Sequence, residues 1–248
     1  MIAAQPLIDL LLPLAVIYAR IQACLLAMPG TGERMLPVRI RVGLALALTP
    51  MFSAAAPVLP SVAPWQNAVL IGAEIVTGLC IGLLVRLLAM SLDIASTALA
   101  QSASLSAMLG ISDDMPPHPV GNLMHLAGLA VLMAMGLPLL ICQVMADSLR
   151  IMPPGSLPQI GTLWPAVMDL VVHSFTLALL LASPFILGGL LFQVLSGVVA
   201  RVMPAMPVVF IAAPAVILLA LVALAMLVPG LLAIWGNDLI RFNLPEAS

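Results

Sequence analysis

The segment Gly197–Pro214, GVVARVMPAMPVVFIAAP, places a single charge between two long apolar stretches. An arginine such as Arg201 is costly in apolar surroundings unless it lies at a membrane boundary or has a partner inside a protein assembly. Pro204 and Pro207 follow it with the spacing Pro-x-x-Pro, and prolines free backbone groups that lipid cannot hydrogen-bond. We therefore predict a protein-lined or interfacial break between two helices at this point of the chain.

The composition of the whole chain is that of a membrane protein. Of the 248 residues, 63% are hydrophobic and 7% are charged, and the mean hydropathy is +1.24. A soluble domain carries about 25% charged residues, so this chain has too few charges to build a water-facing surface around its core. The bilayer or a hydrophobic partner must be the solvent for much of it. The net charge of −2 gives no reason to expect nucleic acid as a partner.

The hydrophobic pattern predicts an all-α membrane protein with about six kinked, proline-broken helices. We find no composition shift that marks a second domain, so we expect a single integral membrane domain over residues 1–248. The apolar stretches are Leu7–Met28, Val42–Leu59, Ala68–Met90, Val120–Ala146, Ala166–Ala200 and Val208–Val228. We expect breaks at Gly136-Leu137-Pro138 and at Pro229-Gly230, and a connecting segment over Asp147–Trp164.

The region between the third and fourth apolar stretches differs from the rest. Ser91–Gly110 is rich in alanine and serine and only weakly apolar, which is compatible with a helix but makes a poor lipid-facing span. Ile111–Pro119, ISDDMPPHP, is acidic and interrupted by prolines, so we expect a loop there.

The first apolar stretch does not have the pattern of a cleaved signal. No basic residue precedes Arg20, and Asp9 interrupts the apolar run. We therefore expect the uncleaved stretch itself to drive insertion into the membrane.

The sequence contains no recognisable catalytic or metal-binding motif. It has no Gly-x-Ser-x-Gly, no His-Glu-x-x-His and no phosphate-binding loop, so we expect no enzyme activity and no cofactor. The cysteines and histidines are scattered, at Cys24, Cys80, Cys142, His118, His125 and His173. Asp169 and His173 share one helix face at i, i+4 spacing, which leaves an intramembrane site open. A position near the membrane boundary is the favoured interpretation.

Glu74 and Arg86 are charges inside the third apolar stretch. They are twelve residues apart, or roughly 18 Å along a helix, so they cannot pair within that helix and each needs another partner. The functional interpretation of Glu74 is a proton or ion site. The structural interpretation, which we favour because a lone carboxylate makes no relay, is a hydrogen bond to a helix of a neighbouring chain. In the same stretch, Gly78-x-x-x-Gly82 places two small residues on one helix face.

Two methionines, Met203 and Met206, flank Pro204 in the segment that contains Arg201. Methionine side chains are flexible and polarizable and can seal an irregular passage. Ordinary hydrophobic packing is the alternative, and the abundance of methionine (16 residues) favours it.

Five sequence blocks, taken in their order along the chain, carry a resemblance to a known family. They are Arg20 with Met28-Pro29-Gly30, Glu33, Pro37, Arg39, Arg41 and Leu44–Pro50; Glu74 with Gly78 and Gly82; Gln101 to Asp113-Asp114 and Val120; Ser148–Gly155; and Gly197–Pro214. This order resembles that of the FliR/SctT family of flagellar and injectisome type III export gates. The chain departs from the family where it has Ala205 and Pro207 in place of the usual Gln and Asn. It departs again at Gly136-Leu137-Pro138, where many members have Gly-His-His.

The resemblance implies a non-enzymatic subunit of a type III protein export gate in the bacterial inner membrane, at the flagellar basal body. Such a subunit assembles with FliP-like and FliQ-like membrane proteins into a helical complex that forms the export pore. An FlhB-like protein associates with the complex, and unfolded export substrates pass through its centre. Structural and assembly roles would then fall to a set of charged and loop residues. These are Glu74, Arg86, Arg201, Pro204 and Met206.

The resemblance also assigns a closing element to the pore. In the family, the loop between the third and fourth apolar regions acts as a plug, and by position it corresponds to about residues 105–119 here. The residues expected in or near the passage are Leu105, Met108, Asp113, Asp114 and Met115.

Three alternative functions stay open, the first from the resemblance and the other two from the residues. The first is an injectisome export-gate subunit of the SctT type, and the second is a self-contained secondary transporter with a midplane site built from broken helices. The third is an intramembrane enzyme, against which the missing catalytic cluster argues. A gate subunit is expected to be unstable alone and to co-purify with two smaller hydrophobic partners, whereas a transporter is expected to be stable by itself.

Overall fold

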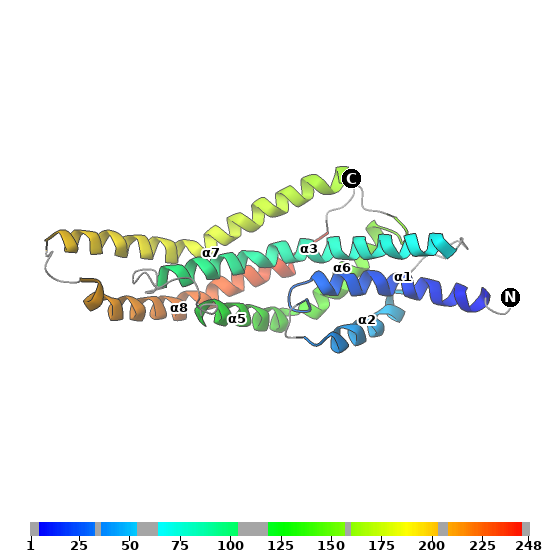
Figure 1. Cartoon of the computed structure of the whole chain (residues 1–248), viewed down its shortest axis with the longest axis horizontal. Helices are drawn as coiled ribbons and strands as arrows, with labels where there is room; N and C mark the ends of the chain where they lie inside the picture. Colours follow the sequence, from blue (N-terminus) through cyan, green and yellow to red (C-terminus); the bar gives the residue numbers. More distant parts are fainter. Residues whose placement is uncertain are drawn as a thin grey trace. The chain divides into compact units, whose positions relative to one another are not determined.

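The computed structural model describes residues 5–32, 36–53, 64–103, 119–156, 160–202 and 208–244. The regular elements in these ranges are all helices, without strands, which confirms the predicted all-α class (Figure 1). The helices are α1 (Gln5–Ala27), α2 (Val38–Ser53), α3 (Pro64–Ala103), α5 (Pro119–Met135), α6 (Leu137–Ile151), α7 (Ile160–Val202) and α8 (Val208–Ile240).

Within the described part of the chain, three helices contain segments that are long and apolar enough to cross a membrane. They are Trp65–Ala98 in α3, Trp164–Val199 in α7 and Val222–Ile240 in α8. A fourth span results if α5 and α6, which are bent at the break between them, form one broken crossing. Together with the all-α fold, these segments define an integral membrane protein.

The predicted break inside the fourth apolar stretch is confirmed at Gly136. This residue separates α5 from α6 with a left-handed backbone, φ 106° and ψ 34°. Glycine adopts that conformation without the steric cost that a Cβ atom adds. Pro138 lies in the first turn of α6, where its missing N–H would have no helical partner in any case.

One other predicted break is wrong, and one predicted connection is shorter than expected. Helix α8 runs through Pro229-Gly230 and ends at Ile240, because an apolar environment offers the backbone no partner other than the helix itself. The expected connecting segment over Asp147–Trp164 is shorter than predicted, since α6 extends to Ile151 and α7 begins at Ile160. The weakly apolar sequence after Met90 continues α3 as far as Ala103.

The chain divides into two compact units, each with its own apolar core. Unit 1 comprises Met1–Leu88, Gly136–Val171 and Arg241–Ser248, and unit 2 comprises Ala89–Met135 and Val172–Ile240. Helices α3 and α7 each contribute one part to unit 1 and the other part to unit 2.

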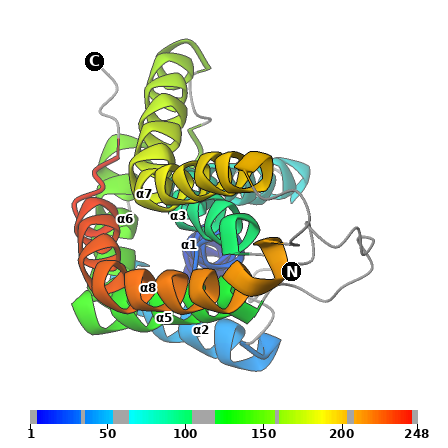
Figure 2. The ribbon, with the colours of Figure 1, turned by 90° about the vertical axis from the view of Figure 1, so that its left-hand side faces the viewer.

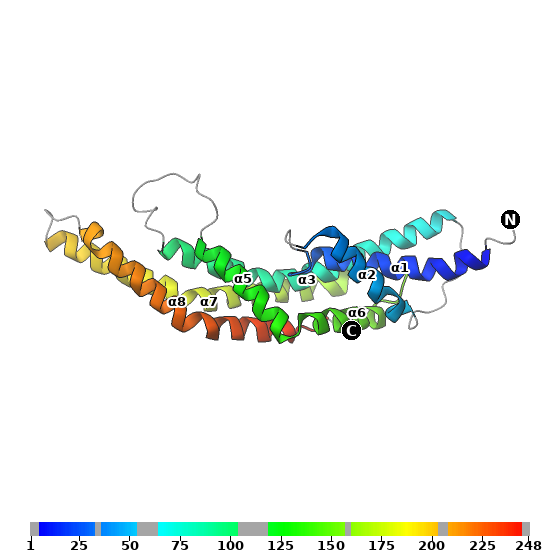
Figure 3. The same ribbon diagram turned by 90° about the horizontal axis from the view of Figure 1, so that it is seen from below.

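In unit 1, α1 packs against α2 and against the first part of α3 (Figure 3). The predicted small-residue face of α3 lies at this contact. A Cβ atom at Gly78 would collide with the backbone carbonyl of Arg20, and one at Gly82 would come within 2.6 Å of the carbonyl of Cys24. Ala23 and Ala27 face the same two glycines. Small residues at both surfaces therefore let α1 and α3 approach closely, running parallel to each other.

In unit 2, α5 lies beside α8 (Figure 2). The indole of Trp235 on α8 is buried over Gly128 of α5, and Gly236 lies against Met135. Glycines again make room for a large neighbour, here a ring and a thioether.

Candidate functional site

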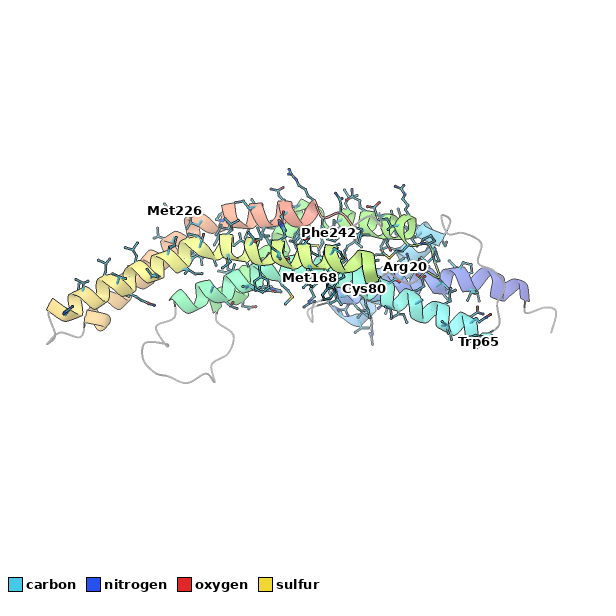
Figure 4. All side chains as sticks on the ribbon, turned by 90° about the horizontal axis from the view of Figure 1, so that it is seen from above. Arg20, Trp65, Cys80, Met168, Met226 and Phe242 are labelled. Carbon is cyan, nitrogen blue, oxygen red and sulfur yellow. The ribbon has the colours of Figure 1, made fainter. Side chains whose placement is uncertain are left out.

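A buried ion pair joins α1 to α3 in unit 1. Arg20 is 1% exposed and Glu74 is 0% exposed. The Arg20 Nε donates to Oε2 of Glu74, and Nη2 donates to Oε1 at 3.0 Å. The two parallel hydrogen bonds match the fork of the guanidinium to the carboxylate, the strongest geometry for such a pair. Figure 4 labels Arg20 among the packed side chains of this region.

The remaining side of the guanidinium binds the end of α6. Nη1 of Arg20 donates to the carbonyl oxygen of Met152 at 2.8 Å, to that of Ser148 at 3.2 Å and to the Ser148 hydroxyl at 3.1 Å. The last carbonyls of a helix have no partner within the helix and carry its negative dipole end. Arg20 therefore caps α6 while it neutralises Glu74.

The turn that follows α6 completes the cluster. Gly155 has a positive φ of 90°, and its backbone N–H donates to Oε1 of Glu74 at 2.7 Å. Both oxygens of the carboxylate are thus occupied. One ion pair connects α1, α3, the end of α6 and the turn at residues 152–155; we call Arg20, Glu74, Ser148, Met152 and Gly155 the polar cluster.

Because the polar cluster is buried, it has a large effect on the stability of unit 1. An ion removed from water costs several kcal/mol, which only a close partner and further hydrogen bonds offset. The described neighbours supply both, so the cluster holds helices in one arrangement. Leaving either charge without the other is expected to cost about 3–5 kcal/mol.

The polar cluster corrects one expectation from the sequence. A helix of a neighbouring chain was the favoured partner for Glu74, but its partner is Arg20 of the same chain. The signal was present in the sequence, because Arg20 and Glu74 are opposite charges within apolar stretches. Residue spacing alone did not bring them together, since 54 positions separate them.

Three of the five resemblance blocks meet in this cluster. Arg20 opens the first block, Glu74 opens the second, and Ser148–Gly155 is the fourth. These segments are far apart in the chain, and the structure brings them together in one hydrogen-bonded cluster.

The other candidate residues lie outside the polar cluster. Arg86 is half-buried on α3, and Arg201 is exposed in the last turn of α7. Pro204 and Met206 lie outside the described residues, and so do the plug candidates Leu105, Met108, Asp113, Asp114 and Met115.

The histidines of unit 2 bridge helices. Nε2 of His173 on α7 lies 2.7 Å from Oδ2 of Asp238 on α8, and Nδ1 of His125 on α5 lies 2.9 Å from Oδ1 of Asp93 on α3. Asp169, at i−4 from His173, is exposed. Among the described residues no group of three or more His, Cys, Asp or Glu side chains is placed to hold a metal ion.

Comparison with known proteins gives the class of this membrane protein. Residues 11–241 match the family described as bacterial export proteins, family 1. The chain is also 30% identical over 229 residues to the flagellar biosynthetic protein FliR of Caulobacter vibrioides, an alignment that covers 90% of this chain and 91% of that protein. The chain therefore belongs to the FliR/SctT family of bacterial export proteins.

Proposed function

We propose that this chain is a non-enzymatic subunit of the flagellar type III protein export gate. The observation that carries the proposal is the 30% sequence identity to a flagellar biosynthetic protein over almost the full length of both chains. Its location would be the inner membrane at the flagellar basal body. The apolar helices are consistent with a membrane-embedded part of such an apparatus.

The proposal includes the partners that the family resemblance implies. The gate would form from this chain with FliP-like and FliQ-like proteins, an FlhB-like protein would associate with it, and unfolded substrates would pass through. Large apolar side chains are exposed along α7 and α8 of this chain, among them Leu180, Leu190 and Met226. Protein neighbours or lipid must cover them.

Within this assembly, the polar cluster has a structural role in the proposal. It links α1, α3 and the end of α6 through hydrogen bonds within this chain. Unit 1 would thus offer the partners a preformed surface. Arg86 and Arg201 stay candidates for contacts in the assembly, and residues 105–119 stay the candidate plug.

The test combines a cellular and a biochemical measurement. Deletion of the gene in its own organism should abolish swimming, and a tagged copy should restore it. The tagged chain, extracted in mild detergent, should bring with it the FliP-like and FliQ-like proteins, identified by mass spectrometry. Normal swimming with loss of effector secretion would instead indicate an injectisome subunit. A stable solitary chain that transports a small solute into vesicles would indicate a secondary transporter.

A further inference from the structure

Helix α6 of unit 1 has an apolar side and a polar side. Apart from Ser148, the side chains that it buries are apolar, namely Leu137, Leu140, Ile141, Val144 and Met145. On the outward side, Gln143 and Arg150 are exposed, and Asp147 is half-buried. The spacing i, i+4, i+7 places these three on one face of the helix. We call Gln143, Asp147 and Arg150 the polar stripe.

The polar stripe is not suited to contact with lipid. Charged side chains are costly among acyl chains and normally face a protein interior or a water-filled cavity. The exposed large apolar side chain of α6, Leu139, lies in the first turn, before the polar stripe begins. A helix with an apolar side against its own core and a polar side outward is typical of a surface that faces water.

The polar cluster fixes where the polar stripe lies along the helices of unit 1. Ser148, which is between Asp147 and Arg150 in the sequence, accepts a hydrogen bond from Arg20. The same guanidinium of Arg20 holds Glu74 of α3. The end of α6 that carries Asp147 and Arg150 is therefore level with Glu74 on α3.

At this same level, α3 exposes apolar side chains. Ile75 and Val76, which directly follow Glu74, are 41% and 48% exposed, and Leu79 is 37% exposed. These side chains need lipid or an apolar partner helix as a neighbour. If the end of α6 only projected from the membrane into water, α3 would be expected to expose polar side chains there too. One level of unit 1 thus has an apolar side on α3 and a polar side on α6, as a wall between lipid and water requires.

We propose that the polar stripe of α6 faces a water-filled passage in the assembly and contacts the hydrated, unfolded polypeptide that passes through it. The stripe offers an amide, a carboxylate and a guanidinium, which together donate and accept hydrogen bonds. Such groups bind water and the backbone of an extended chain without selecting one sequence. This inference rests on the proposed function, because the passage exists only in the assembled gate, and it adds the surface of this chain that forms part of the wall.

Gln143 and Val76 provide a contrasting pair for the test, one on each side of unit 1. Gln143→Cys and Val76→Cys are made singly, and the parent chain, whose three cysteines are buried or half-buried, gives the baseline. The purified complex is reconstituted in lipid and treated with a charged methanethiosulfonate, which reacts with the thiolate form and therefore needs water. Mass spectrometry of this chain measures the rate of modification at each position.

A second measurement fills the passage. The complex is purified from cells that produce an export substrate fused to a tightly folded domain, which halts the substrate during transit. We expect the thiol at position 143 to react several-fold faster than the thiol at position 76 in the empty complex, and the halted substrate to slow the reaction at position 143 several-fold. If Gln143→Cys does not assemble, Arg150→Cys gives the same measurement two turns further along the polar stripe.

Three results would overturn the inference in a complex of verified composition. Slow reaction at both positions would show that a partner protein or lipid covers the polar stripe. Fast reaction at both would remove the contrast between α6 and α3. Fast reaction at position 143 that the halted substrate does not change would place the stripe in water outside the passage. All three leave the proposed function intact, whereas a chain that never isolates with FliP-like and FliQ-like proteins contradicts the proposed function itself.

Discussion

The two units of this chain use polar side chains in opposite ways. In unit 1, Arg20 and Glu74 are buried, and both oxygens of the carboxylate accept hydrogen bonds from this chain. In unit 2, the side chains of the His173–Asp238 pair are 54% and 33% exposed, those of the His125–Asp93 pair are 31% and 51% exposed, and each pair joins two helices. The difference teaches that burial, rather than the presence of an ion pair, decides how strongly a pair specifies a fold.

The largest expected effect follows from removing one member of the buried pair. Glu74→Ala leaves Arg20 charged and unpaired, and we expect a loss of about 3–5 kcal/mol in the free energy of unfolding. Thermal unfolding of the purified complex and the amount of chain in the membrane measure this loss. Asp169→Asn, at an exposed carboxylate, is the control and should leave both unchanged.

A double variant sharpens the same test. Arg20→Met with Glu74→Leu removes both charges, and apolar replacements of a buried ion pair are often neutral or stabilising. We expect the double variant to recover much of what Glu74→Ala alone loses. Equal loss in both would show that losing the Arg20 hydrogen bonds to Ser148 and Met152 costs as much as removing the unpaired charge regains.

The second effect concerns the close approach of α1 and α3. In Gly78→Ala the new Cβ atom meets the carbonyl oxygen of Arg20, so the helices must separate, at a cost of about 1–3 kcal/mol. Gly72→Ala on the same helix meets nothing within 4 Å and should be neutral or stabilising, because alanine favours the helix. Denaturant unfolding of both variants measures the difference. Equal stabilities would contradict the packing of α1 on α3.

The third effect concerns the break between α5 and α6. Gly136→Ala places a Cβ atom at φ 106°, and we expect a cost of about 1–2 kcal/mol from backbone strain alone. Neither Gly136 nor Gly121 has a neighbour within 4 Å of a built Cβ atom, so Gly121→Ala is the matched control. A lowered thermal midpoint for the first variant, with an unchanged or raised midpoint for the second because Gly121 lies within α5 and alanine favours the helix, checks the left-handed turn.

The smallest effect is expected at the exposed bridges of unit 2. Asp238→Asn and Asp93→Asn each weaken one histidine contact, and exposed pairs of this kind contribute about 0–1 kcal/mol. The thermal midpoint of either variant should therefore stay close to that of the parent chain. A loss as large as that of Glu74→Ala would show that these pairs are enclosed in the assembly, and would remove the contrast between the two units.

The apolar patterning and the placement of glycine allowed the helices and one break to be predicted from the sequence. The few charges required a non-aqueous environment, the apolar stretches predicted helices, and Gly136-Leu137-Pro138 predicted the break that the structure contains. The break predicted at Pro229-Gly230 is wrong. Sequence reasoning assumes that water can hydrogen-bond the backbone groups that a proline frees, whereas an apolar environment gives the backbone no better partner than the helix.

By itself, the sequence determined that this is a helical membrane protein, because composition and hydrophobic periodicity act locally along the chain. The tertiary structure alone decided which charges meet. Glu74 could not pair with Arg86 on its own helix, and its actual partner, Arg20, lies 54 positions away. The parallel packing of α1 on Gly78 and Gly82 brings the two together. Contacts of this range depend on the joint placement of several helices, and no spacing within one helix encodes them.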